Sequence, residues 1–227
     1  MPSQRAIFLS ASIPIPKRSA KYFATADPVA IGAAVSALVN VTLGRRLLVW
    51  GGHPSITPMI WTTASDLGLD YGAWVHLFQS RLYEDDFPEE NGRFKNVTYV
   101  DAVDRERGRS LAAMRRRMIE DFEYEAGVFI GGMEGVEREF GLFRRRHRDA
   151  QVLPFASTGG AALLLYDRTP GLPSCLKDSL DYVGVIHRML RIPPSELRRE
   201  YPTAPIPRGR RGMRRLPAIR SRRLREE

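Results

Sequence analysis

The chain has very little cysteine and no long apolar run. Cys175 is the single cysteine among 227 residues, which excludes an intramolecular disulfide and a metal site built from several thiolates. No apolar run is long enough to cross a bilayer, and residues 1–20 lack the apolar core of a signal peptide. We therefore expect a cytoplasmic protein, not a transmembrane one, with no metal and no cofactor.

Two common nucleotide-binding motifs are missing as well. The chain has no G-x-G-x-x-G pattern, which argues against a redox dinucleotide site, and it has no P-loop, because no lysine follows a glycine turn. Five carboxylates fall within residues 83–92, but their spacing matches no set of metal ligands. We interpret this stretch as a solvated loop.

Positive charge gathers at the C-terminal end. The net charge is +9, and residues 201–227 hold nine arginines and two glutamates, so the first 200 residues carry only +2. Residues 193–227 are rich in proline and arginine and have no apolar period, which predicts a disordered tail after a single domain at 1–192. Through charge alone the tail could contact nucleic acid or an acidic surface, and the alternative is a plain solvated extension.

Apolar segments recur along the chain in a pattern that predicts alternating strands and helices. One helix opens with Asp27 as N-cap and Pro28 as its first residue. At least five strand–helix repeats imply an α/β fold with a doubly wound, mainly parallel sheet and helices on both faces. Strands are expected at 5–9, 46–50, 74–79, 96–100, 127–130 and 150–155, and helices at 27–44, 58–68, 105–123, 133–146 and 176–190, with a short one ending at 165.

The most informative stretch is residues 127–140, where a short buried strand runs into a glycine turn and then a helix. In such a turn free backbone N–H groups can point at an anion, and glycines let a ligand approach the backbone closely. A βα turn without any ligand is the alternative, because a short glycine pattern is a weak signal.

Similar stretches of small residues follow other predicted strands. The carboxyl ends of parallel strands share one edge of the sheet, where α/β proteins bind their ligands, so this coincidence predicts a phosphate-bearing ligand at that edge. For His53 the alternative is a turn histidine that faces water. The predicted ligand-binding residues are Ser10, Ser12, Gly51, Gly52, His53, Gly131, Gly132, Glu134, Gly135, Ser157, Thr158 and Gly159.

The predicted helix at 105–123 carries three arginines in a row, at 115–117. Successive helical residues are rotated by about 100°, so the three cannot all face one way. Arg117 lies three residues after Met114, which is on the apolar face, so its side chain could point into a cleft at the carboxyl edge of the sheet. A solvated arginine cluster is the alternative.

Several of these segments resemble the LOG proteins and, more widely, the SLOG superfamily, which joins SMF/DprA and LOG. Residues 48–52 are similar to the second-strand glycine loop of LOG proteins, and residues 130–139 are similar to their motif proline-glycine-glycine-x-glycine-threonine-x-x-glutamate. Residues 114–117 resemble the segment that supplies the LOG catalytic arginine. The resemblance covers about residues 5–190 and is nearest to the SLOG domains of bacterial conflict and antiviral systems.

The resemblance implies a Rossmann-like domain with one of two functions. The first is a binding module that senses a nucleotide or nucleotide-derived ligand and controls a separately encoded effector. The second is a phosphoribohydrolase that cleaves the N-glycosidic bond of a nucleoside 5'-monophosphate, with Glu139 and Arg117 as catalytic residues. By analogy, the resemblance also implies a homodimer or higher oligomer with the helix at 105–123 in its interface.

The chain departs from the LOG motif in three ways, of which the last two favour the binding module, whereas the retained Glu139 and Arg117 keep the enzyme as the alternative. Ile130 stands in place of the proline, Glu134 adds a residue between the glycines, and Val136 replaces the threonine. Without that hydroxyl the turn lacks a hydrogen bond to a charged phosphate, which is worth about 1.5–3 kcal/mol.

Overall fold

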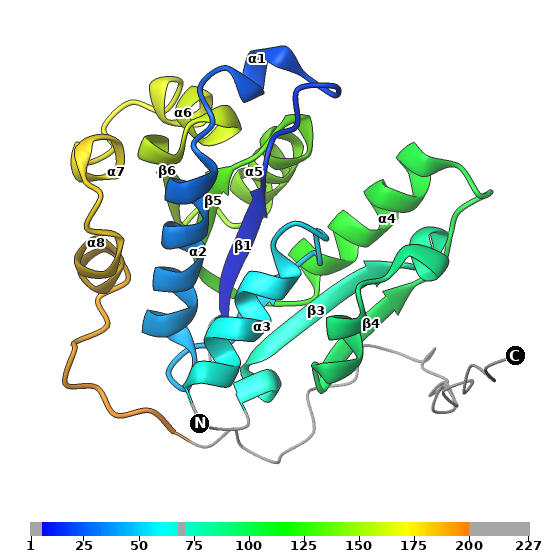
Figure 1. Ribbon diagram of the computed structural model, residues 1–227, viewed down its shortest axis with the longest axis horizontal. Coiled ribbons are helices and arrows are strands. Elements are labelled where there is room, and N and C mark those ends of the chain that lie inside the picture. The colour runs from blue at the N-terminus through cyan, green and yellow to red at the C-terminus, as the bar shows by residue number, and fades with distance from the viewer. Residues whose placement is uncertain (1–5, 68–70, 200–227) are drawn as a thin grey trace, which may run out of the picture.

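The computed structural model describes residues 6–67 and 71–199, and in this part of the chain the six predicted strands form one parallel sheet (Figure 1). The strands are β1 (Ala6–Ser12), β2 (Leu48–Trp50), β3 (Val75–Ser80), β4 (Asn96–Val100), β5 (Tyr124–Gly131) and β6 (Gln151–Phe155). Their order across the sheet is β4-β3-β2-β1-β5-β6. The chain therefore moves outward from β1 to β4 and then returns to β5 on the other side of β1.

Helices cover both faces of this sheet. They are α1 (Ala20–Phe23), α2 (Pro28–Thr42), α3 (Thr57–Asp66), α4 (Arg107–Glu120), α5 (Glu134–Arg146), α6 (Gly160–Asp167), α7 (Cys175–Asp178) and α8 (Tyr182–Met189), with shorter 3-10 turns η1 (Tyr71–Trp74), η2 (Arg81–Asp86), η3 (Glu89–Arg93) and η4 (Ala156–Thr158). One apolar layer holds α2, α3 and α8, the other α4, α5 and α6. Figure 1 shows α8 beside α2, and α4 near β3 and β4. The predicted doubly wound α/β fold is confirmed.

The central strand β1 joins the two layers, because its side chains alternate between the faces of the sheet. Ile7 and Leu9 lie in the layer of α2, α3 and α8. Phe8 lies in the other layer, where its ring stacks on Phe143 of α5 with centroids 5.2 Å apart. Ser10 continues the Phe8 side of the strand and so reaches α5 at the carboxyl edge.

The start of α2 follows the sequence prediction. The side chain of Asp27 accepts hydrogen bonds from the backbone N–H groups of Val29 (2.9 Å) and Ala30 (3.0 Å), and Pro28 is the first helical residue. The helix ends at Thr42, and Gly44 follows with φ +78°, a conformation that glycine adopts readily. These contacts confirm the cap that was predicted from the Asp-Pro pair.

The helix predicted at 176–190 is in fact two short helices, α7 and α8. Asp181 breaks the run, since its carboxylate accepts the Gly184 N–H at 2.9 Å and starts α8 anew. The apolar residues Leu176 and Val185 are buried on both sides of the break, so the apolar pattern alone does not reveal it. Among the helices of the described ranges, none is long and apolar enough to cross a membrane.

Residues 193–199, the start of the predicted tail, are held against the domain. Glu196 pairs with Arg46 at 2.7 Å, and its backbone oxygen accepts a hydrogen bond from Arg45 at 2.7 Å. The backbone N–H of Arg199 donates to the Gly44 oxygen at 2.7 Å. These seven residues thus belong to the folded unit, and the rest of the predicted tail, 200–227, lies outside the described residues.

A buried histidine under α4 gives the fold a dependence on pH. His76 of β3 is 7% exposed, contacts the Phe78 and Phe122 rings, and lies 2.7 Å from the Thr98 hydroxyl through Nε2. Burial, assisted by the charge of Arg117, lowers the pKa of His76 from 6.5 to about 4. The folded state therefore keeps this ring neutral at pH values where the unfolded chain protonates it.

The free energy of unfolding should fall as the pH drops below 6.5. At these pH values His76 is protonated in the unfolded chain but stays neutral in the folded one. At pH 5 the protonation of His76 in the unfolded chain lowers the free energy of unfolding by about 2 kcal/mol relative to neutral pH. We expect urea unfolding at pH 7 and pH 5 to show a smaller pH effect in His76→Phe than in the native chain. Thr98→Val is the control, since it removes the partner but keeps the imidazole. An unchanged pH effect in His76→Phe would contradict the assignment.

Candidate functional site

A cavity of about 450 Å³ opens at the carboxyl edge of the sheet. It lies where the strand order reverses, because the chain leaves β1 toward α2 and leaves β5 toward α5, on opposite faces. Its lining residues are Leu9, Ser10, Ala11, Ser12, Arg18, Trp50, Gly51, Gly52, His53, Pro54, Gln79, Ser80, Tyr83, Asp86, Phe87, Pro88, Arg107, Leu111, Met114, Arg115, Met133, Glu134, Gly135, Val136 and Glu139.

A three-residue network joins β1, α4 and α5 at the wall of this cavity. The Ser10 hydroxyl donates to Glu139 Oε2 at 2.6 Å, and Arg115 Nε donates to Glu139 Oε1 at 2.9 Å. The side chains of Arg115 and Glu139 are only 12% and 14% exposed. A carboxylate this buried needs its partners, because leaving the charge unpaired away from water is costly.

Of the three arginines at 115–117, Arg115 lines the cavity, and Arg117, which was expected to point into it, does not. Arg117 is absent from the cavity wall, and its Nε bonds to Asp121 at 2.8 Å, one turn along α4. Two helical steps rotate a side chain by about 200°, so residues 115 and 117 point to opposite flanks of the helix. Arg115 is on the flank beside α5, where it meets Glu139.

The glycine turn after β5 is used by the fold itself. Gly131 and Gly132 have φ of +55° and +85° and do not line the cavity. The Gly131 N–H donates to Thr158 Oγ1 at 2.8 Å, and the Gly132 N–H donates to the Ser12 oxygen at 2.8 Å. A Cβ on Gly131 would lie 2.5 Å from Ile31 Cδ1, which explains the glycine without a ligand.

The strand end after β6 also lies away from the cavity. The Ser157 hydroxyl donates to the Tyr182 hydroxyl at 3.2 Å, and the Thr158 hydroxyl donates to the Phe155 oxygen at 2.6 Å. Gly159 has φ +68°, and a Cβ there would lie 1.8 Å from the Thr25 backbone oxygen. The hydroxyls and glycine of this turn thus hold η4 and the start of α6 in place.

The turn after β2, in contrast, faces the cavity as predicted from its sequence. Gly52 has φ +68°, and Gln79 Nε2 donates to its oxygen at 3.1 Å. The Ser55 N–H donates to His53 Nδ1 at 3.3 Å, which assigns the proton of a neutral ring to Nε2. Burial, with a smaller effect of the Arg18 charge, lowers the pKa of His53 to about 4, so the ring is neutral at pH 7.

Seven of the predicted ligand-binding residues line the cavity and five do not. Those at the wall come from the ends of β1 and β2 and from the start of α5. They are Ser10, Ser12, Gly51, Gly52, His53, Glu134 and Gly135, and those away from it are Gly131, Gly132, Ser157, Thr158 and Gly159.

The sequence reasoning missed several residues of the cavity wall. Gln79 follows the same rule as Ser10, a polar residue at the end of a buried strand, and could have been found by it. Arg18 sits in a loop without any pattern to mark it. The stretch interpreted as a solvated loop supplies Tyr83 and Phe87, while Glu84 beside them is exposed.

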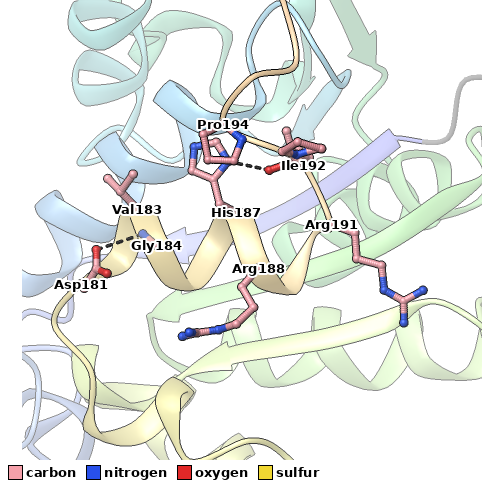
Figure 2. A pocket seen from close by; sticks show the side chains of 9 residues that line it. Asp181, Val183, Gly184, His187, Arg188, Arg191, Ile192 and Pro194 are labelled. Carbon is pink, nitrogen blue, oxygen red and sulfur yellow. Dashed lines mark hydrogen bonds between the residues drawn. The ribbon is translucent and has the colours of Figure 1, made fainter.

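A second hollow, of about 820 Å³, runs along the outer side of α8 (Figure 2). In Figure 2 the guanidinium groups of Arg188 and Arg191 extend on one side of α8, and the ring of His187 lies on the other. His187 Nδ1 lies 2.7 Å from the Ile192 oxygen, a contact that closes the C-terminal end of the helix. The hollow is larger than the cavity at the sheet edge, but it contains none of the predicted site residues, so the sheet-edge cavity is the candidate site.

The model of the SLOG cluster3 family matches residues 21–190, a range that contains every element from α2 to α8 and all but the first residue of α1. No curated protein matches the chain. Within the described ranges, no group of three or more His, Cys, Asp or Glu side chains is arranged to hold a metal ion.

Gly159→Ala should test whether the turn after β6 is structural. We expect a loss of several kcal/mol in unfolding free energy, because the new Cβ meets backbone and not a movable side chain. Gly171→Ala is the matched control, with φ +81° and nothing within 4 Å of its Cβ, and should lose about 1–2 kcal/mol from backbone strain alone. Equal losses of unfolding free energy in the two variants would show that the contact with Thr25 does not contribute to stability.

Proposed function

This chain belongs to the SLOG cluster3 family, and we propose that it binds a nucleotide or nucleotide-derived ligand in the cavity at the carboxyl edge of its sheet. The observation that carries the proposal is the cavity itself, which brings the ends of β1, β2 and β3 together with the start of α5. Its volume of about 450 Å³ lies within the range of small-molecule sites.

The chemistry of the walls supports a ligand with a flat ring and polar substituents. Tyr83 and Phe87 give the cavity an aromatic side, and Met114 and Leu111 of α4 add apolar surface. Polar residues at strand ends, Ser10, Ser12 and Gln79, and six charged residues from loops and helices complete the wall, and such groups fix the orientation of a small molecule. A nucleoside presents this combination of an apolar face and hydrogen-bonding edges.

We favour a sensor over an enzyme for two reasons. Val136 stands where the LOG motif has its threonine, is 4% exposed, and packs against Gly132. Glu139 is already bonded to Arg115 and Ser10. In this proposal the protein acts in a bacterial defence system and controls a separately encoded effector, with a homodimer or higher oligomer as the signalling unit.

The alternative is a nucleotide N-glycosidase, and the placement of Glu139 on the cavity wall favours it. In that reaction a water oxygen forms the new bond to the ribose C1', and the base leaves with a proton. Glu139 would stabilise the cationic sugar or activate the water, and Arg115 would take the role first expected of Arg117.

A thermal-shift screen followed by chromatography separates the two functions. The panel holds AMP, ADP-ribose, NAD, cyclic nucleotides and cyclic ADP-ribose forms. We expect at least one of them to raise the melting temperature and to be recovered intact. Recovery of a free base and a ribose phosphate would instead establish the enzyme, and no stabilisation by any member would contradict nucleotide binding.

Glu139→Gln tests the network at the cavity wall. Removing the charge leaves the Arg115 guanidinium without its ion pair at 12% exposure, so we expect a loss of about 3 kcal/mol in unfolding free energy. Glu134→Gln changes an exposed carboxylate one helical turn earlier, and its stability should stay within about 0.5 kcal/mol of the native chain. A Glu139→Gln variant as stable as Glu134→Gln would show that the pair contributes nothing to folding.

A further inference from the structure

The hollow along the outer side of α8 has a wall that only one segment of the chain supplies. Its nine lining residues all lie within 181–194, whereas the cavity at the sheet edge is walled by residues of several elements. Small-molecule sites enclose most of the surface of their ligand, and a single segment does not do so. The hollow, of about 820 Å³, is therefore a surface groove that a segment of another chain can fill (Figure 2).

Apolar surface is exposed at both ends of this groove. Val183 lines its N-terminal end at 45% exposure, and Leu180, directly before the cap residue of α8, is 72% exposed. Pro193 and Pro194 line the other end and are exposed as well. Because proline has a fixed φ, that end needs little ordering when a partner arrives. Exposed apolar side chains gathered in this way are typical of protein–protein contact surfaces.

Two arginines lie at the C-terminal end of the groove. Arg188 and Arg191 line it, both are exposed, and Figure 2 shows their guanidinium groups on the same side of α8. Neither forms an ion pair within the described ranges. The carboxylate of the wall, Asp181, accepts the Gly184 N–H at the other end of the helix, about 15 Å away at 1.5 Å per residue. Both guanidinium groups are thus available to a carboxylate from outside.

The backbone conformation of Arg191 is unusual. The Ile192 N–H donates to the His187 oxygen at 3.0 Å, and the Arg191 N–H donates to the Arg188 oxygen at 3.3 Å, the pattern of a Schellman cap. Arg191 has φ +52°, in the left-handed region where such a cap usually has glycine. The strain of an arginine there exceeds the usual gain from a cation at a helix end. Folding alone therefore favours glycine at 191, and departures from a local rule are expected at functional positions.

The charge of the groove restricts what can occupy it. Residues 201–227 of the chain carry nine arginines and two glutamates, so two arginines at the groove repel them. A second copy related by a two-fold axis through α8 would bring the same arginines together and meet the same repulsion. A partner with carboxylates beside apolar side chains matches the groove, because arginine binds a carboxylate through two parallel hydrogen bonds.

We infer that the groove along α8 is a docking site for an acidic, apolar segment of a partner protein, with its carboxylates bound by Arg188 and Arg191 and an apolar side chain against Val183. The separately encoded effector of the proposed function would be one such partner, but the docking site requires no nucleotide and is tested without one. At about 3.3 Å per residue, the length of α8 accepts about five residues of an extended segment.

The test selects twelve-residue peptides from a random phage-displayed library on the full chain. We expect the recovered peptides to combine Asp or Glu with large apolar residues. In fluorescence anisotropy they should bind Arg188→Gln and Arg191→Gly about tenfold or more weakly than the native chain, the effect expected for one lost charge-assisted hydrogen bond. Arg191→Gly should also raise the melting temperature by about 2–4 °C, because it relieves the strain at φ +52°. Weaker binding by a more stable variant is not a result of unfolding.

Arg105→Gly is the matched control, since Arg105 has the same φ of +52°, is exposed and lies outside the groove. It should raise the melting temperature similarly and leave peptide binding unchanged. Recovery of no peptide, of peptides without acidic residues, or of peptides that bind Arg191→Gly as tightly as the native chain would overturn the inference. So would a lower melting temperature of Arg191→Gly, which would give Arg191 a role in folding. A changed oligomeric state of that variant in sedimentation would overturn it too, by making the groove a contact between copies of this chain.

Discussion

The hydrogen bonds that close the carboxyl edge over β5 constrain most of what surrounds the cavity. The Gly132 N–H donates to the Ser12 oxygen, and the Ala161 N–H donates to the Gly132 oxygen, at 2.8 and 2.9 Å. Together with the bond from Gly131 to Thr158, they tie the ends of β1, β5 and β6 to one point, from which α5 and α6 depart to the same face. A side chain at Gly131 or Gly132 would collide with its neighbours, so the fold itself requires glycine at both positions of this turn.

The hydrogen bonds of this turn also determine where the cavity lies. Because the edge is closed over β5 and β6, the open space lies over β1, β2 and β3, with α4 and α5 as its far wall. Ser10 and Arg115 bind Glu139 from two other elements and so fix α5 against β1 and α4. A wall held this way is already formed before a ligand arrives, which reduces the ordering that binding would require.

Sequence patterns predicted the fold well because parallel strands are buried on both faces and therefore appear in the sequence as short continuous apolar runs, as at 47–50 and 128–130. They failed at the break between α7 and α8, where apolar spacing continues and only the Asp181 cap marks a new helix. At the candidate site, the ends of the predicted strands led to Ser10 and Gly52, and both line the cavity. A sequence does not show whether the hydroxyl of Thr158 binds a ligand or a backbone N–H. The structure shows that it accepts the Gly131 N–H, because of how the turn packs.

The ion pair between Glu139 and Arg115 has different consequences for the two candidate functions, a binding module and an N-glycosidase. An enzyme that used Glu139 on a cationic sugar would draw the carboxylate away from Arg115, and a guanidinium at 12% exposure would need a new anion. The phosphate of a ligand could supply that anion only by lying beside α4. A binding module meets no such conflict, because it keeps the ion pair between Glu139 and Arg115 intact.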